Sequence, residues 1–109
     1  MLPKENRIVS PNDFRHVMRK GKRVTTPTQG ITLHIVKRSD NVSRYGFIIT
    51  KKTGNAVARN RLKRQLREIA QAHMVTVTTG YDIVMRVNPT DNEVTWGALN
   101  KEITKILSR

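Results

Sequence analysis

Hydrophobic and polar positions divide the chain into segments with helical spacing and segments with strand spacing. Near the amino terminus, Ser10 can cap a helix, Pro11 suits its first position and Gly21 supplies a stop. Between them, Phe14 and Val17 recur at helical spacing and make an apolar side. The pattern predicts a short helix over about residues 11–20.

Two later segments alternate apolar and polar side chains with the period of a β-strand. In residues 29–36, apolar side chains alternate with Thr32 and His34, and residues 45–50 repeat the alternation. Residues 37–44, between these strands, are expected to form a hairpin loop. One face of the resulting sheet should pack on helices, while the face with Thr and His could stay open.

Three further segments bear on the number of strands. Residues 25–28, with Pro27, are typical of a turn or a short edge strand, because proline cannot donate to a ladder. Residues 75–80 are β-branched and end in glycine, which fits either a loop or a brief strand. Residues 81–87 predict a clear strand, with Ile83 among the apolar side chains of one face.

The stretch from Lys51 to Glu68 carries seven Lys or Arg residues and no acid before its last position. A break at Gly54 precedes a predicted helix over about residues 56–72. One face of this helix should carry the polar and cationic side chains Arg59, Asn60, Lys63, Arg64 and Arg67. The opposite face should carry Ala58, Leu62, Leu66, Ile69 and His73.

An exposed basic face is most often simply solvated. Basic helices of this density normally carry Glu at i,i+4 spacing to relieve self-repulsion, and none is present here before Glu68. The pattern therefore favours a face that meets a polyanion.

The last part of the chain predicts one more helix. Thr90 and Glu93 have the spacing of a capping box and should open it. Its apolar stripe is Trp96, Leu99, Ile103, Ile106 and Leu107. Trp96 is expected to be a core anchor rather than a platform for base stacking.

Together these segments predict an α/β (α+β) two-layer sandwich, with a sheet of about four strands and helices to one side. The order is α-β-β-(β)-α-β-α, where the bracket marks an uncertain strand. The basic helix should join the strands at 45–51 and 81–87 as a parallel crossover. A chain of 109 residues is expected to be a single domain, residues 1–109.

Charge changes this picture more than overall composition does. The net charge is +13, and residues 1–67 hold seventeen of the basic and only three of the acidic side chains. Such a field attracts polyanions, so the first two thirds should build a binding surface. No cysteine is present, and no apolar run reaches the ~20 residues of a membrane span. With no secretory signal, a cytoplasmic protein without a membrane partner is expected.

The chemistry-bearing residues do not form a catalytic pattern. His16, His34 and His73 fall in three different elements without metal-ligand spacing. The carboxylates are scattered, and GNAVARNR lacks the second glycine and the Lys-Ser/Thr of a phosphate loop. We expect no catalytic residue and no metal ligand in this chain, which is predicted to be a binder.

Residues 49–69, ITKKTGNAVARNRLKRQLREI, resemble the signature of the bacterial ribonuclease P protein subunit. Arg59, Asn60 and Arg61 match its Arg-Asn-Arg core. Matching residues on either side of that core are Lys51, Lys52, Gly54, Asn55, Ala56, Val57, Lys63, Arg64 and Arg67. Further likeness runs from Asp13 and Phe14 to Pro89, so the resemblance covers most of the chain.

The resemblance implies a role in a ribonucleoprotein. In that family a large RNA, with Mg²⁺ held mainly by the RNA, removes the 5′ leader of precursor tRNA, and the catalytic groups belong to the RNA. The resemblance implies that the crossover carrying the basic helix is left-handed. No protein partner is evident from the sequence. Residues implied to bind the catalytic RNA are Arg59, Asn60, Arg61, Lys63, Arg64 and Arg67. Those implied to bind the leader are Phe14, Val17, His34, Ile48, Thr50, Lys51 and Lys52.

Two positions depart from the family pattern, because Met18 and His34 stand where many members have an aromatic residue. Leader binding is therefore expected to depend more on phosphate attraction than on base stacking. Two alternatives use the same basic surface: a general or ribosome-associated RNA-binding protein, and a DNA-bound architectural protein.

Overall fold

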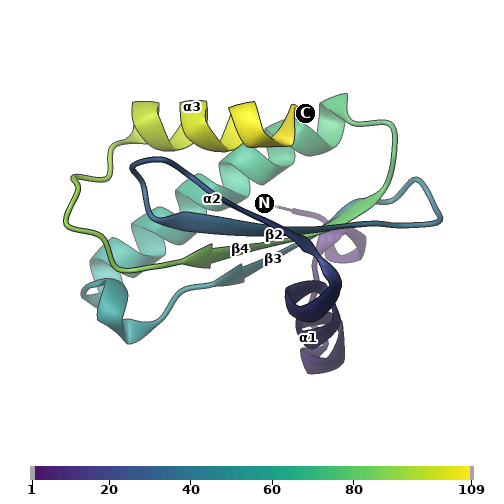
Figure 1. The fold of residues 1–109 in the computed structure, drawn as a ribbon, viewed down its shortest axis with the longest axis horizontal. Helices are drawn as coiled ribbons and strands as arrows, with labels where there is room; N and C mark the ends of the chain where they lie inside the picture. Colours follow the sequence, from purple (N-terminus) through teal and green to yellow (C-terminus); the bar gives the residue numbers. More distant parts are fainter. Residues whose placement is uncertain (1, 109) are drawn as a thin grey trace.

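The computed structural model describes residues 2–108, in which three α-helices and a four-stranded sheet form one body (Figure 1). The helices are α1 (Pro11–Lys20), α2 (Ala56–Thr76) and α3 (Trp96–Leu107). The strands are β1 (Lys22–Thr25), β2 (Ile31–Lys37), β3 (Arg44–Ile48) and β4 (Tyr81–Val87). Two short 3-10 helices are Lys4–Asn6 and Lys51–Thr53. The predicted α/β (α+β) class, the sheet of about four strands and the predicted element order are confirmed.

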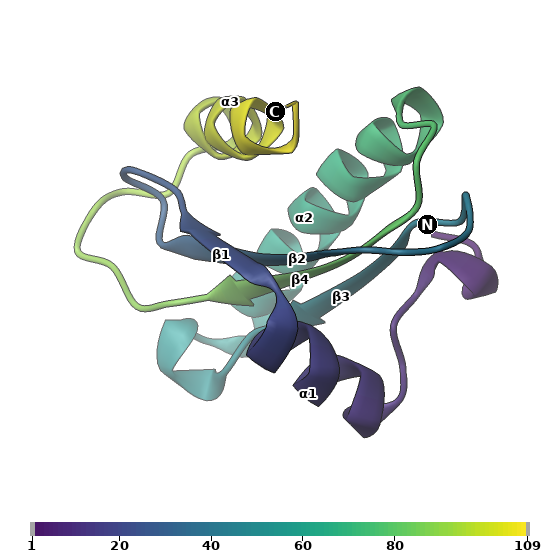
Figure 2. The same ribbon diagram turned by 45° about the vertical axis from the view of Figure 1, so that its right-hand side comes forward.

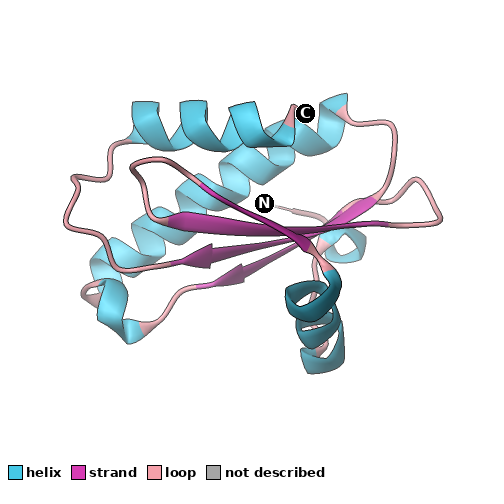
Figure 3. Cartoon of the chain, viewed as in Figure 1, coloured by secondary structure: helices cyan, strands magenta, loops and turns pink. Residues whose placement is uncertain are grey.

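The strands of the sheet, magenta in Figure 3 and labelled in Figure 2, lie in the order β1-β2-β4-β3. β4 pairs antiparallel with β2 and parallel with β3, so α2 connects neighbouring parallel strands as predicted. The expectation of a hairpin loop over residues 37–44 is wrong, because β4 inserts between β2 and β3. The implied left-handedness of the crossover stays a prediction.

The hairpin that does form joins β1 to β2. It places the edge strand at Lys22–Thr25, and residues 26–28, which the sequence left open between a turn and a short edge strand, belong to the turn. Pro27 lies in the connecting turn, and the backbone N–H of Ile31 donates to the Thr26 hydroxyl at 3.0 Å. The sequence pattern did not identify the segment just after α1 as a strand.

Helices cover both faces of the sheet, so the expectation of helices on one side only is wrong (Figures 1 and 2). α2 and α3 pack on one face, where β2 and β4 contribute Leu33, Ile83 and Met85 to the main core. α1 packs on the other face, where Ile8, Val17 and Val84 form a smaller buried cluster. The polar side chains of β2 on that second face are buried, since Thr32 and His34 are only 2% and 3% exposed, so the face is not open at these two positions.

Side chains cap the starts of α1 and α3, but the cap of α3 is not the residue that the sequence predicted. The Ser10 hydroxyl accepts from the N–H of Asn12 and opens α1 as predicted. α3 begins at Trp96 with Thr95 as its cap, so the predicted start at Thr90 is wrong. Thr90 instead caps a turn by accepting from the N–H of Asn92, and the helix starts one turn later.

The end of α2 and the burial of Trp96 also differ from expectation. α2 continues to Thr76, and residues 77–80 form a loop, which settles the segment left open between strand and loop. Trp96 is 40% exposed and lies outside the main core, so its assignment as a core anchor is wrong. Leu99, Ile103 and Ile106 are buried as predicted.

Candidate nucleic-acid interface

α2 follows a turn at Gly54, whose backbone conformation residues other than glycine rarely adopt. Gly54 has φ +149°, a conformation that side chains disfavour. The next residue, Asn55, caps the helix by accepting from the N–H of Ala58 at 2.8 Å. Nη1 of Arg59 donates to the Gly54 carbonyl at 2.7 Å, which ties the start of the helix to the turn. Arg59 therefore has a structural contact as well as an outward charge.

Along α2 the two faces separate as predicted. Leu62, Leu66 and Ile69 are buried against the sheet, whereas Ala58 at the first turn is exposed. The opposite face carries what we call the basic ridge: Arg59, Lys63, Arg64 and Arg67. Lys63 and Arg64 are exposed and Arg59 and Arg67 are half-buried. Asn60, also exposed, lies on the same face among these cations, and the exposed Arg61 lies beside it.

The charges of the basic ridge are not compensated within the described part of the chain. Ion pairs among residues 2–108 involve the cations Arg38 and Arg44 and no cation of α2. Four unpaired cations along one helical face repel one another, which costs folding free energy unless an anion approaches. The uncompensated charges of the ridge therefore favour the binding of a polyanion.

The second candidate surface, which we call the α1 face, is the sheet face that α1 partly covers. The register aligns Thr32, Arg86 and Ile48 across three strands. Phe14 of α1 lies directly on β3, since a Cβ at Gly46 would stand 2.6 Å from its ring. Gly46 thus permits a close approach that any other residue would block.

The α1 face does not present all the residues implied to bind a leader. Thr50, Lys51 and Lys52 are exposed just after β3, and Phe14 and Ile48 are half-buried. Val17 and His34 are buried, at 0% and 3% exposure. In this conformation their side chains support the face from within.

His34 is buried without a hydrogen-bond partner at either ring nitrogen, and Nε of Arg86 is also unpaired. Burial, with the nearby charges of Arg86 and Arg23, lowers the pKa of His34 from its ordinary value and favours the neutral ring. Arg86 was not identified from the sequence as a site residue. The signal was present, because Arg86 falls between the core residues Met85 and Val87 and must point to the opposite face.

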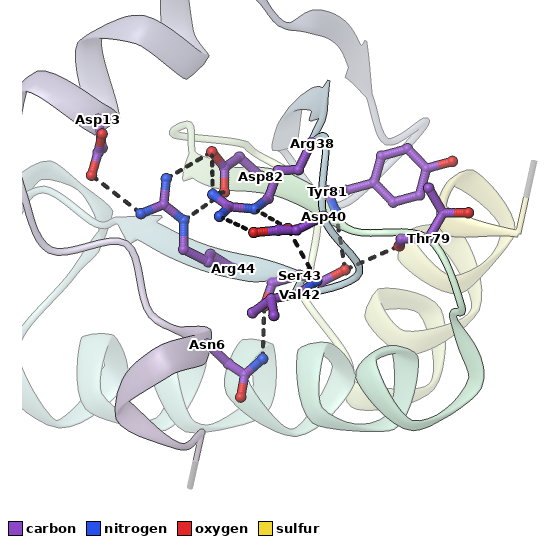
Figure 4. A network of polar contacts seen from close by, with 10 residues as sticks. All are labelled: Asn6, Asp13, Arg38, Asp40, Val42, Ser43, Arg44, Thr79, Tyr81 and Asp82. Atoms are coloured by element: carbon purple, nitrogen blue, oxygen red, sulfur yellow. Dashed lines mark hydrogen bonds and ion pairs between the residues drawn. The ribbon is translucent and has the colours of Figure 1, made fainter.

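An ionic network holds α1 to the sheet (Figure 4). Arg44 grips the Asp82 carboxylate with two bonds of 2.8 Å and reaches Asp13 of α1 at 3.3 Å. Arg38 contacts the same carboxylate at 3.1 Å and also pairs with Asp40. Burial alone would raise the pKa of Asp82, but the contacts with both arginines outweigh it and lower that pKa.

The sequence profile of the Ribonuclease P family matches residues 2–109. The chain belongs to the ribonuclease P protein family. It is 37% identical to the ribonuclease P protein component of Clavibacter michiganensis subsp. michiganensis, over 100% of this chain and 96% of that protein. The corresponding protein of Syntrophomonas wolfei subsp. wolfei is 33% identical, over 100% of this chain and 90% of its own length.

Solved structures of the family share the fold. The ribonuclease P protein of Staphylococcus aureus superposes with a TM-score of 0.82 at 25% identity, covering 96% of this chain and 94% of that one. The protein from Thermotoga maritima gives 0.80 at 25% identity, covering 94% and 96%. The resemblance inferred from residues 49–69 is thereby confirmed for the family and the fold.

Neither a metal site nor a membrane span is recognisable in residues 2–108 of this family member. No three His, Asp or Glu side chains in that range lie close enough together to hold a metal ion. Helices of the length and apolarity needed to cross a bilayer are likewise not found there.

Proposed function

We propose that this chain is the protein subunit of a ribonuclease P particle. It binds the catalytic RNA and the 5′ leader of precursor tRNA and assists Mg²⁺-dependent removal of the leader in the bacterial cytoplasm. Membership of the family supports this role, since its relatives are named as ribonuclease P protein components. The chain would be an enzyme only as part of that particle.

The observation that carries the proposal is the basic ridge. Its four cations lie on one side of α2 without acidic partners in the described chain. Arginine is suited to this task because its planar fork can bond phosphate oxygens in pairs. We assign the ridge, with Asn60 and Arg61, to the catalytic RNA.

We assign the α1 face to the leader. Lys51 and Lys52 would attract its phosphates, while Phe14 and Ile48 would offer partly exposed apolar surface. Thr50 would border the same path, and Val17 and His34 would shape it from below. Arg86, which the structure adds to this face, would supply a further cation.

No step of the reaction is assigned to a metal on the protein. We propose that Mg²⁺ is held mainly by the RNA, which also supplies the groups that cut. The protein would lower the repulsion between catalytic RNA and substrate and would hold the leader in place. Both effects should matter most when Mg²⁺ is scarce, because fewer ions then screen the phosphates.

Reconstitution tests the proposal directly. Ribonuclease P RNA and precursor tRNA are combined at low Mg²⁺, with and without the protein, and leader release is followed on a gel. We expect cleavage at one position and a clear increase in rate when the protein is present. An unchanged rate, with the RNA active at high Mg²⁺, would contradict the role.

RNA that copurifies with the protein separates this role from the alternatives. One discrete structured RNA of a few hundred nucleotides is expected. Ribosomal RNA would favour a ribosome-associated protein, and duplex DNA would favour an architectural one.

A further inference from the structure

A hollow of about 240 Å³ lies at the free edge of β3, between the two surfaces described above. Its walls include Ile8, Val9, Phe14, Phe47, Lys63 and Arg67. They come from the segment before α1, from α1 itself, from β3 and from α2. The hollow is smaller than the ~300 Å³ at which pockets for drug-sized ligands begin, so it suits one flat ring system.

The strand edge in this hollow is paired at a single point within residues 2–108. Arg7 forms an isolated parallel bridge with Tyr45, and the N–H of Ile8 donates to the Tyr45 carbonyl at 2.9 Å. Backbone groups of alternate strand residues point the same way. The N–H and C=O of Phe47 are therefore directed to this edge, where they can bond the edge of a planar ligand.

The walls combine apolar surface with positive charge. Phe14 lies against Gly46 on one face of β3, and Phe47 packs toward the main core on the other. Lys63 and Arg67 of the basic ridge stand at the rim, and neither has an ion-pair partner in the described chain. An anion that carries an aromatic ring would satisfy both features.

We propose that the hollow takes one unstacked nucleotide of the catalytic RNA. The base would enter beside the aromatic side chains, and its phosphates would meet Lys63 and Arg67. A regular RNA helix presents phosphates and would leave an apolar hollow empty, whereas a splayed-out base fills it. This inference rests on the proposed function, because it takes the ridge to face that RNA.

Two matched positions allow a direct test. Val9 lines the hollow and is 76% exposed, while Val75 lies near the far end of α2 and is 79% exposed. Each is replaced in turn by benzoylphenylalanine, a photoreactive residue, in the full chain. After irradiation with ribonuclease P RNA, primer extension maps the joined nucleotides. Both positions are exposed, so neither replacement should disturb folding.

We expect one dominant stop in the RNA from position 9 and no matching stop from position 75. An abasic ribose at the mapped nucleotide should then weaken binding of the unmodified protein roughly tenfold, as expected for loss of one stacked base. Scattered stops from position 9, or unchanged affinity of the abasic RNA, would overturn the assignment of the hollow. Filter binding that shows no complex with the unmodified protein would overturn the proposed function as well.

Discussion

At the scale of single residues, burial and charge compensation decide which side chains can act. Arg64 and Lys63 are exposed and lack acidic partners in the described chain, so their charges are available to a ligand. His34 and Val17 resemble site residues in sequence, but both are buried where α1 meets the sheet. The pattern of residue types predicted the ridge correctly, whereas access to the α1 face required the packing of α1.

Arg64→Ala should weaken binding of ribonuclease P RNA by about 1 kcal/mol or more, because a charge-assisted phosphate contact is lost. Filter binding at fixed salt measures the change. Lys101→Ala is the matched control, since Lys101 is exposed on α3, away from the ridge. Equal losses for both variants would show that only net charge matters.

One buried and one half-buried histidine, His34 and His73, should make stability depend on pH. Nδ1 of His73 contacts the Tyr45 hydroxyl at 2.6 Å, and burial lowers the pKa of His73, as it does for His34. The unfolded chain therefore binds protons first, near the ordinary value of 6.5. The contribution of the two neutral histidines to the free energy of unfolding should be fully present above that pH. It should be lost progressively as the pH drops below it.

Urea unfolding at a series of pH values between about 7.5 and 5.5 checks this expectation. His73→Gln and His34→Gln should each flatten the dependence. His16→Gln is the control, because His16 is exposed on α1. A slope that survives in the double variant of His34 and His73 would refute the explanation.

At the scale of elements, α1 is the helix whose position would matter most for the proposed leader site. It is joined to the sheet by the small cluster around Val17 and by the contact of Asp13 with Arg44. Arg44 is itself oriented by Asp82, whose side chain is only 8% exposed. The ionic network therefore sets where α1 lies as well as contributing to stability.

Asp82→Asn should lower the free energy of unfolding by about 2–3 kcal/mol, since two partly buried arginines lose their shared counter-charge. Chemical denaturation measures the loss. Asp40→Asn should cost much less, because that carboxylate is exposed and water can replace it. Similar losses for the two variants would mean that burial of Asp82 adds nothing.

At the scale of the whole molecule, a small domain of 109 residues carries a net charge of +13. The cations lie mainly in the first two thirds of the chain, which supplies the basic ridge and most of the α1 face. Such a field attracts any nucleic acid, and shape at the two surfaces must then select the partner.

Binding of a single-stranded leader oligonucleotide should weaken steeply with salt. A plot of log affinity against log salt is expected to have a slope of about −2 to −3, equivalent to three or four neutralised phosphates. Fluorescence anisotropy over a salt series gives the slope. A flat response would argue for a partner held by other forces.

Local patterns in the sequence determined the helices, three of the strands, the two faces of α2 and the family itself. Period, capping residues and the Arg59-Asn60-Arg61 core depend on neighbours a few positions apart, so they are legible in the chain alone. Strand order, the edge strand β1, the burial of His34 and the hollow beside Phe47 came only from the tertiary structure. Each of these depends on contacts between segments far apart in the chain, and above all on β4 entering between β2 and β3.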